Sequence, residues 1–158
     1  MSIFLGGTGS ANELDDYEIG TYSPALGANG NFSGGNGLGC TYSIQNGNYV
    51  KIGNFVFCNG LLAWSAKSGT LSNSSGVNLT LSLPFAMGGS INNGAGQLPY
   101  NDAIDFNADC RNVHGVGSNA YIFFERVSTG SGKHTGYVKT NNLNSSGQIN
   151  FAYSYRIL

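Results

Sequence analysis

The stretch NYVKIGNFVFCNGLLAWSA, residues 48–66, decides the fold class. Gly53-Asn54 is a dipeptide typical of tight turns, and large apolar side chains alternate with others on both sides of it. Val56, Cys58, Leu62 and Trp64 share one phase of this alternation, so they are predicted to face the core together. The stretch therefore predicts antiparallel strands.

The same period of two continues along the rest of the chain. CTYSIQ (40–45) and NYVKI (48–52) flank Asn46-Gly47, which predicts a hairpin turn at that dipeptide. VNLTLSL (77–83) and INFAYSYRI (149–157) alternate in the same way, and no window has the apolar spacing of a helix. We expect an all-β, antiparallel, jelly-roll-like β-sandwich over residues 39–158.

Residues 1–38 differ from the remainder in composition. Acidic ELDDYE is followed by GANGNFSGGNGLG, a segment rich in glycine and asparagine and poor in apolar periodicity. Such a segment gains order by lying on something larger. We expect an extended N-terminal arm that serves attachment and trimer contacts.

Charge excludes one class of partner. The 158 residues carry seven Lys or Arg and eight Asp or Glu, a net charge of −1, so nothing resembles a basic stripe for nucleic acid. The start MSIFLGG lacks the pattern of a signal peptide, and no apolar run is long enough to span a membrane. We expect a soluble chain made in the cytosol.

Cofactor and metal motifs are missing from the sequence. The three cysteines are odd in number and widely spaced, which predicts reduced thiols, with Cys58 in the core. Two histidines are too few for a histidine metal cage. The sequence STGSGKHT (128–135) lacks the first glycine and the hydroxyl residue of a phosphate loop. We predict neither cofactor nor metal.

Candidate binding residues lie in polar loops that also contain aromatic side chains. Flat aromatic faces beside amide and carboxylate groups suit sugar rings, although ordinary exposed turns have the same composition. The predicted ligand-binding residues are Tyr100, Asn101, Asp102, His114, His134 and Tyr137. No catalytic residue is predicted: G-x-S-x-G is missing, and sequence alone does not reveal the spacing of a carboxylate pair.

Four segments together resemble a known family. ELDDYEIGTYSPAL (13–26), IQNGNYVKIGNFVFCNGLLAWSA (44–66), LSLPFA (81–86) and the terminal INFAYSYRIL are similar to a β-rich, receptor-binding, tail-fibre-type domain of structural proteins from tailed bacteriophages. Tyr22 stands where this family usually has tryptophan. The resemblance implies a homotrimer, other phage virion proteins and a host cell-surface glycan as partners, and a place in the virion, assembled in the host cytoplasm.

The resemblance and the residues together predict a non-enzymatic virion protein. The leading expectation is a trimeric tip of a tail fibre or baseplate appendage that binds a host-surface saccharide. Proteins of this kind usually carry a long shaft first, whereas this chain opens with Met1 and a short arm. That start favours the alternative, a capsid decoration (cement) protein that stabilises the phage head. A glycan-cleaving enzyme and a free lectin are further alternatives.

Overall fold

The computed structural model describes residues 3–4, 13–14, 16–89, 94–104, 112–127 and 134–157, and nearly all of its regular structure is β-strand. The strands are β1 (Ile3–Phe4), β2 (Glu13–Leu14), β3 (Tyr17–Tyr22), β4 (Leu26–Ala28), β5 (Gly39–Ile52), β6 (Phe55–Ser68), β7 (Leu79–Ser82), β8 (Gly94–Asn101), β9 (Asn112–His114), β10 (Tyr121–Val127), β11 (His134–Tyr137) and β12 (Gly147–Arg156). One short 3-10 turn, η2 (Thr140–Asn142), precedes β12.

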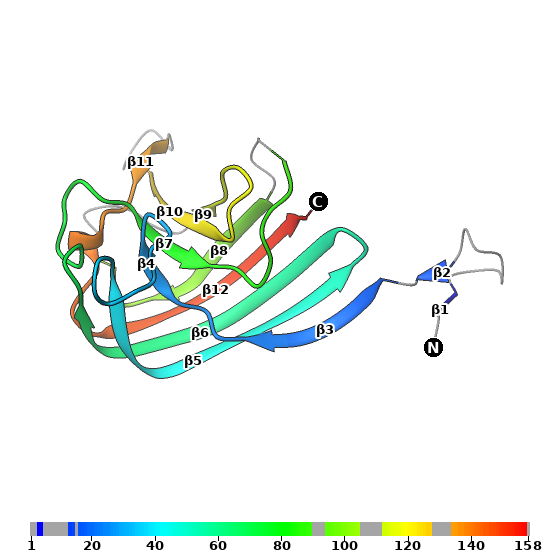
Figure 1. The fold of residues 1–158 in the computed structure, drawn as a ribbon, viewed down its shortest axis with the longest axis horizontal. Helices are drawn as coiled ribbons and strands as arrows, with labels where there is room; N and C mark the ends of the chain where they lie inside the picture. The colour runs from blue at the N-terminus through cyan, green and yellow to red at the C-terminus, as the bar shows by residue number, and fades with distance from the viewer. Residues whose placement is uncertain are drawn as a thin grey trace.

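The main sheet is antiparallel and continuous. Its order is β3-β5-β6-β12-β8-β9-β10-β7-β4, with β11 on β10, and β1 pairs with β2 separately. The predicted all-β, antiparallel class is confirmed. The sheet curls into a half-barrel, so that β4, β7 and β10 lie opposite β5, β6 and β12 (Figure 1). The Leu26 amide donates to the Tyr42 hydroxyl at 2.7 Å and links β4 to β5 across the curl.

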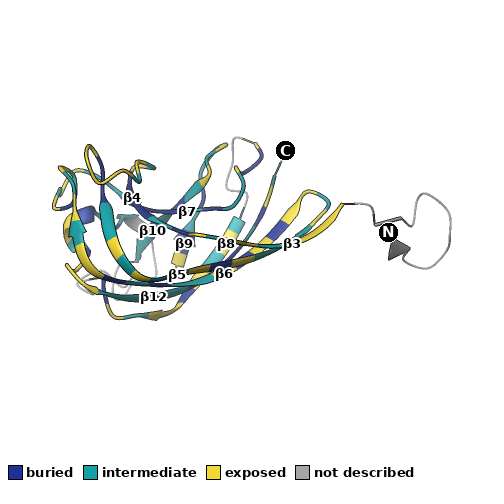
Figure 2. Ribbon diagram, turned by 60° about the horizontal axis from the view of Figure 1, so that its bottom comes forward, coloured by how far each residue is buried: buried dark blue, intermediate teal, exposed yellow. Residues whose placement is uncertain are grey.

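The core fills the space inside the curl. Trp64 is 3 % exposed and Cys58 4 %, so the core positions predicted from residues 48–66 are confirmed. The Trp64 indole N–H donates to the Asn144 carbonyl at 3.3 Å, which satisfies its polar atom. Buried residues line the inner face of the strands, and exposed ones lie mainly on the outer face and in loops (Figure 2).

The predicted hairpin turn at Asn46-Gly47 is wrong, because β5 runs straight through it. Gly47 pairs with Tyr22 on β3 and Gly60 on β6, and Gly60 pairs with Phe151 on β12. A Cβ on Gly47 would lie 2.5 Å from Tyr22 Cε1, and one on Gly60 would lie 2.6 Å from Phe151 Cε1. Two aromatic rings thus occupy the space over two glycines, which explains these glycines without a turn. The turn at Gly53, where φ is 56°, is as predicted.

Part of the predicted arm belongs to the main sheet. Within residues 1–38, β3 pairs with β5 along its length and β4 pairs with β7. Leu26 and Leu38 are fully buried in the core. A boundary at residue 38 therefore passes through the core and not beside it.

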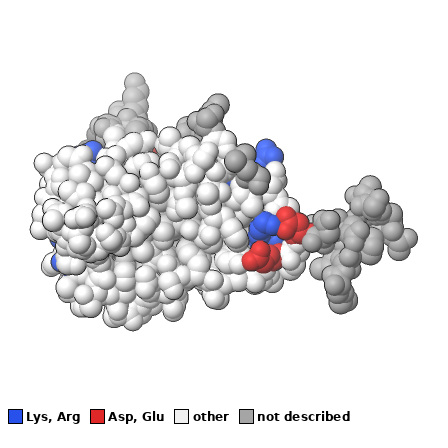
Figure 3. Space-filling view, viewed as in Figure 1, with Lys and Arg blue, Asp and Glu red and all other residues white. Residues whose placement is uncertain are grey.

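Where β3 meets the β5–β6 hairpin, the inner face of the sheet carries polar and charged side chains, and the outer face carries apolar ones. On the inner face, Tyr49 donates to Glu18 and Lys51 pairs with Asp16. In the view of Figure 3 most of the surface is uncharged, and charged side chains gather near this end. The outer face here is an exposed apolar patch, which we call the outer apolar patch. It consists of Tyr17, Ile19, Ile52 and Phe55.

Among the described residues, no helix is long and apolar enough to cross a membrane.

Candidate functional site

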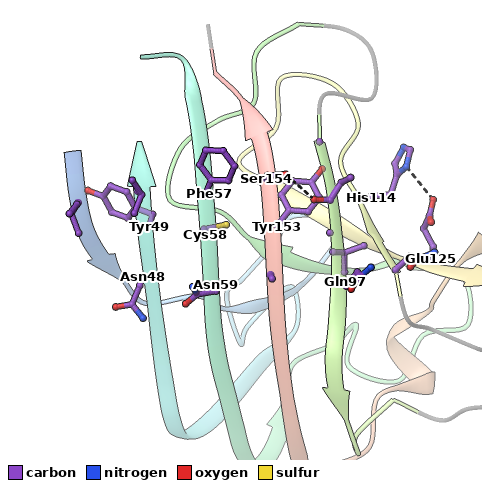
Figure 4. Close-up of a pocket in the computed structure, with 18 residues that line it drawn as sticks. Asn48, Tyr49, Phe57, Cys58, Asn59, Gln97, His114, Glu125, Tyr153 and Ser154 are labelled. Atoms are coloured by element: carbon purple, nitrogen blue, oxygen red, sulfur yellow. Dashed lines mark hydrogen bonds and ion pairs between the residues drawn. The ribbon is translucent and has the colours of Figure 1, made fainter. Parts of the chain in front are cut away.

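A shallow trough of about 780 Å³ crosses the outer face of the sheet (Figure 4). It extends from Ile19 on β3 to Glu125 on β10 and passes over β5, β6, β12, β8 and β9. Because these strands lie side by side in that order, the trough runs across the strands and not along them.

Strand register arranges the trough in two rows, since residues paired across antiparallel strands point to the same face. The apolar row begins at Ile19 of the outer apolar patch and ends at an imidazole. Its members are Ile19, Val50, Phe57, Ser154, Ala95 and His114. A second row, the amide row, lies beside the first and is displaced from it by two residues on each strand; four of its five members are amides. Its members are Asn48, Asn59, Ala152, Gln97 and Asn112.

Small side chains make the floor of the trough low in the middle. Ala95, Ala152 and Ser154 are the outward residues of β8 and β12 there. On the opposite face, Tyr153 lies against Gly94 and Gly96, where an added Cβ would come within 2.6 Å and 2.4 Å of its side chain. The tyrosine ring packs close to β8 from inside because these glycines leave room for it.

Titratable and aromatic groups meet at the β10 end of the trough. His114 Nδ1 lies 3.1 Å from Glu125 Oε1, and both side chains are about four-fifths buried. Tyr137 pairs with Glu125 across β10 and β11, and its ring stacks on Phe123 at 4.6 Å between centroids. The His114 and Tyr137 rings are 6.3 Å apart. This end therefore combines a carboxylate, an imidazole and a flat aromatic surface.

A second cavity of about 380 Å³ adjoins the amide row. Asn48 and Asn59 line both cavities, and Asn46 and Asn150 extend the set of amides. The Asn150 side-chain oxygen is buried and has no hydrogen-bond partner in the structure. A buried polar atom of this kind is costly to leave unpaired.

The structure brings together two of the six predicted binding residues, His114 and Tyr137. Tyr100, Asn101 and Asp102 lie at the end of β8, outside the lining of the trough. The Asn101 side-chain oxygen accepts from the amides of Ala103 and Ile104 at 3.1 and 3.0 Å, which is a local turn contact.

Tyr100 and Asp102 also interact locally. The Tyr100 hydroxyl donates to Asp102 at 3.2 Å, and the negative charge of Asp102 raises the pKa of Tyr100. The Asp102 carboxylate in turn accepts a hydrogen bond from the backbone N–H of Gln148 at 2.5 Å. The backbone of His134 pairs with Val127, and its side chain lies outside the described residues.

The sequence interpretation missed most of the trough, namely Asn48, Phe57, Asn59, Gln97, Asn112 and Glu125. A signal for three of them was present in residues 48–66. Phe57 and Asn59 lie in the phase opposite to the core residues, and the Gly53-Asn54 turn pairs Asn48 with Asn59, so alternation and this turn together placed the three on one outer face.

The chemistry that the trough offers is hydrogen bonding and ring contact. Its described lining has one carboxylate, Glu125, and one imidazole, whereas most glycosidases use two carboxylates across the bond they cleave. Among the described residues no three His, Cys, Asp or Glu side chains gather as metal ligands. The exposed amides and the aromatic ring suit hydrogen bonding and ring packing.

Comparison with known proteins found no match to a protein-family model and no curated protein with significant sequence similarity.

Proposed function

We propose that the chain is a non-enzymatic bacteriophage virion protein, at the tip of a tail fibre or baseplate appendage, that binds a host-surface saccharide in the outer-face trough. The observation that carries the binding proposal is the amide row beside Phe57. The phage context rests on the resemblance of residues 13–26, 44–66, 81–86 and 149–158 to receptor-binding domains.

A saccharide fits this surface for two physical reasons. Its ring presents apolar C–H groups, which pack on exposed aromatic side chains such as Phe57, 51 % exposed. Its hydroxyls both donate and accept hydrogen bonds, and side-chain amides do the same. Asn59 and Gln97 are exposed on the same face as Phe57, so one ligand can use both kinds of contact.

The proposed assembly is a homotrimer whose subunits are jelly-roll-like sandwiches, with the two halves of the curled sheet acting as the two layers. The outer apolar patch supports self-association, because Tyr17 on the edge strand β3, together with Ile52 and Phe55 beside it, exposes apolar surface. Three weak saccharide sites on one particle component would strengthen attachment through avidity. Light scattering that gives 16.5 kDa at micromolar concentration would contradict the trimer.

The outer apolar patch also favours a second candidate, a capsid decoration protein. Such a protein works by burying an apolar surface and its N-terminal segment against neighbouring capsid subunits. The patch includes the first residue of β3, Tyr17, which continues directly from the N-terminal segment. In this case the trough would have no role in adsorption.

The test compares adsorption of the purified protein to host cells with that of two variants. We expect Phe57→Ala and Gln97→Ala each to weaken adsorption about three- to tenfold, the loss of one ring contact or one hydrogen bond. Asn73→Ala, an exposed amide outside both cavities, is the matched control. Unchanged adsorption in both trough variants would refute saccharide binding in the trough. Release of reducing ends from host polysaccharide, lost in Glu125→Gln, would establish an enzyme instead.

A further inference from the structure

We propose that the trough holds a linear, uncharged polysaccharide of several sugar units, laid across the strands so that successive units meet successive amides. This inference rests on the proposed saccharide binding and adds to it the shape, charge and orientation of the ligand.

The length of the amide row is the first argument. Asn48 lies on β5, Asn59 on β6, Gln97 on β8 and Asn112 on β9. From β5 to β9 the sheet has four neighbouring spacings, which amount to about 19 Å at roughly 4.8 Å for each spacing. A single sugar ring is far shorter than this row, whereas an extended chain of rings matches it.

The state of the amides is the second argument. All four side chains are exposed, and none of the four makes a hydrogen bond to another residue in the part of the chain that the structure describes. Each amide offers two donor hydrogens and one acceptor oxygen. Ala152 on β12 interrupts the row, and the unpaired side-chain oxygen of Asn150 lies on the same strand, two residues away. The row therefore offers repeated, unoccupied hydrogen-bonding positions.

Charge is the third argument. Among the described residues, the lining of the trough contains no lysine or arginine, and Glu125 is its one carboxylate. Arg156 belongs to the same face, and its guanidinium lies over the Phe55 ring, 5.3 Å from the centroid. A sulfated, phosphorylated or carboxylated polymer would meet Glu125 without a lining cation to pair with. The described lining thus favours an uncharged chain.

The two ends of the trough are the fourth argument. Phe57 and Val50 stand near one end, and the Phe123–Tyr137 stack stands near the other. Val50 and Phe57 lie beside the amides of β5 and β6, and the Phe123–Tyr137 stack lies beyond Asn112 of β9, so ring packing is available near both termini of the bound segment. A ligand that fills the row gains both kinds of contact at once.

Calorimetry with cello-, malto- and chito-oligosaccharides of one to six units tests the length dependence. In at least one series we expect affinity to rise with every added unit until the trough is filled. The double variant Asn48→Ala/Asn112→Ala removes the two ends of the row. It is expected to lower the affinity for the longest ligand about tenfold or more, and Asn73→Ala to leave it unchanged.

A charged and a neutral polymer of the same backbone separate the remaining alternatives. Hydroxyethylcellulose is expected to bind at least tenfold more tightly than carboxymethylcellulose if the cellulose series binds, and the other series have equivalent derivatives. Equal affinity for one and six units, or tighter binding of the anionic polymer, overturns this inference and leaves saccharide binding intact. Failure of every oligosaccharide and polymer to bind overturns both.

Discussion

Replacing Gly60 with alanine tests the packing of the Phe151 ring over the paired strands β5 and β6. A Cβ at this position would lie 2.5 Å from the Asn46 carbonyl oxygen and 2.6 Å from two carbons of the Phe151 ring. Real Cβ contacts are never this short, so something must move. The ring can turn aside, but the carbonyl belongs to the backbone of the paired strand β5 and moves only if the ladder shifts.

The size of the effect follows from two opposing contributions. Overpacking of a well-packed site costs about 1–3 kcal/mol. Alanine restricts the unfolded chain more than glycine does, which offsets about 0.4–1 kcal/mol of that cost. Since part of the clash is with backbone, we expect a net loss of about 1–2.5 kcal/mol in the free energy of unfolding.

Urea denaturation followed by tryptophan fluorescence measures this loss. We expect a lower midpoint at an unchanged slope, because the surface exposed on unfolding stays the same. The matched control is Gly35→Ala, where a Cβ would meet nothing within 4 Å, and we expect it to match or slightly exceed the wild type. A Gly60→Ala protein within about 0.5 kcal/mol of wild type would refute the packing argument.

Three further predictions concern the core. Burial raises the pKa of the Cys40 and Cys58 thiols from 9.0 to about 11, so their contribution to stability is complete below pH 9.0 and is lost as pH rises through about 11. The urea midpoint should fall over this range, and less so in Cys58→Ala; a flat profile would contradict burial of the thiols. A chain of residues 39–158 loses Leu26 and Leu38, both fully buried, and should show no cooperative thermal transition, whereas a sharp melt would mean that the first 38 residues are dispensable. Trp64, 3 % exposed, should emit at short wavelength, and a solvated emission maximum would contradict its place in the core.

Local pattern predicted the strands well and the turns unevenly. Alternation in residues 48–66 placed Val56, Cys58, Leu62 and Trp64 inside, because a period of two follows directly from strand geometry. Asn46-Gly47 has strong turn propensity, but packing of Tyr22 over Gly47 keeps the strand straight. Propensity is local, and the ring that overrides it comes from a segment more than twenty residues away.

Only part of the trough could be predicted from the sequence. The outward phase of Asn59 could be predicted from alternation, and that of Asn48 from its pairing across the Gly53-Asn54 turn, but the neighbours of these strands could not be predicted. Strand β12, at the end of the chain, lies between β6 and β8, and this order brings Gln97 into line with Asn59. Tyr100 and Asp102 have suitable chemistry for a ligand, yet they are occupied in shaping the turn after β8.

The pairing of Gly47 with Gly60 has a consequence for how the chain finds its fold. Strands β5 and β6 are 14 residues each, and a slip of two residues along the ladder would keep every apolar side chain on its own face. Alternation therefore does not distinguish the native register from its neighbours. The two glycines do, because only one alignment sets them opposite each other and opens space for the rings of Tyr22 and Phe151. Together with the turn at Gly53, these glycines favour a single register for a long, repetitive hairpin.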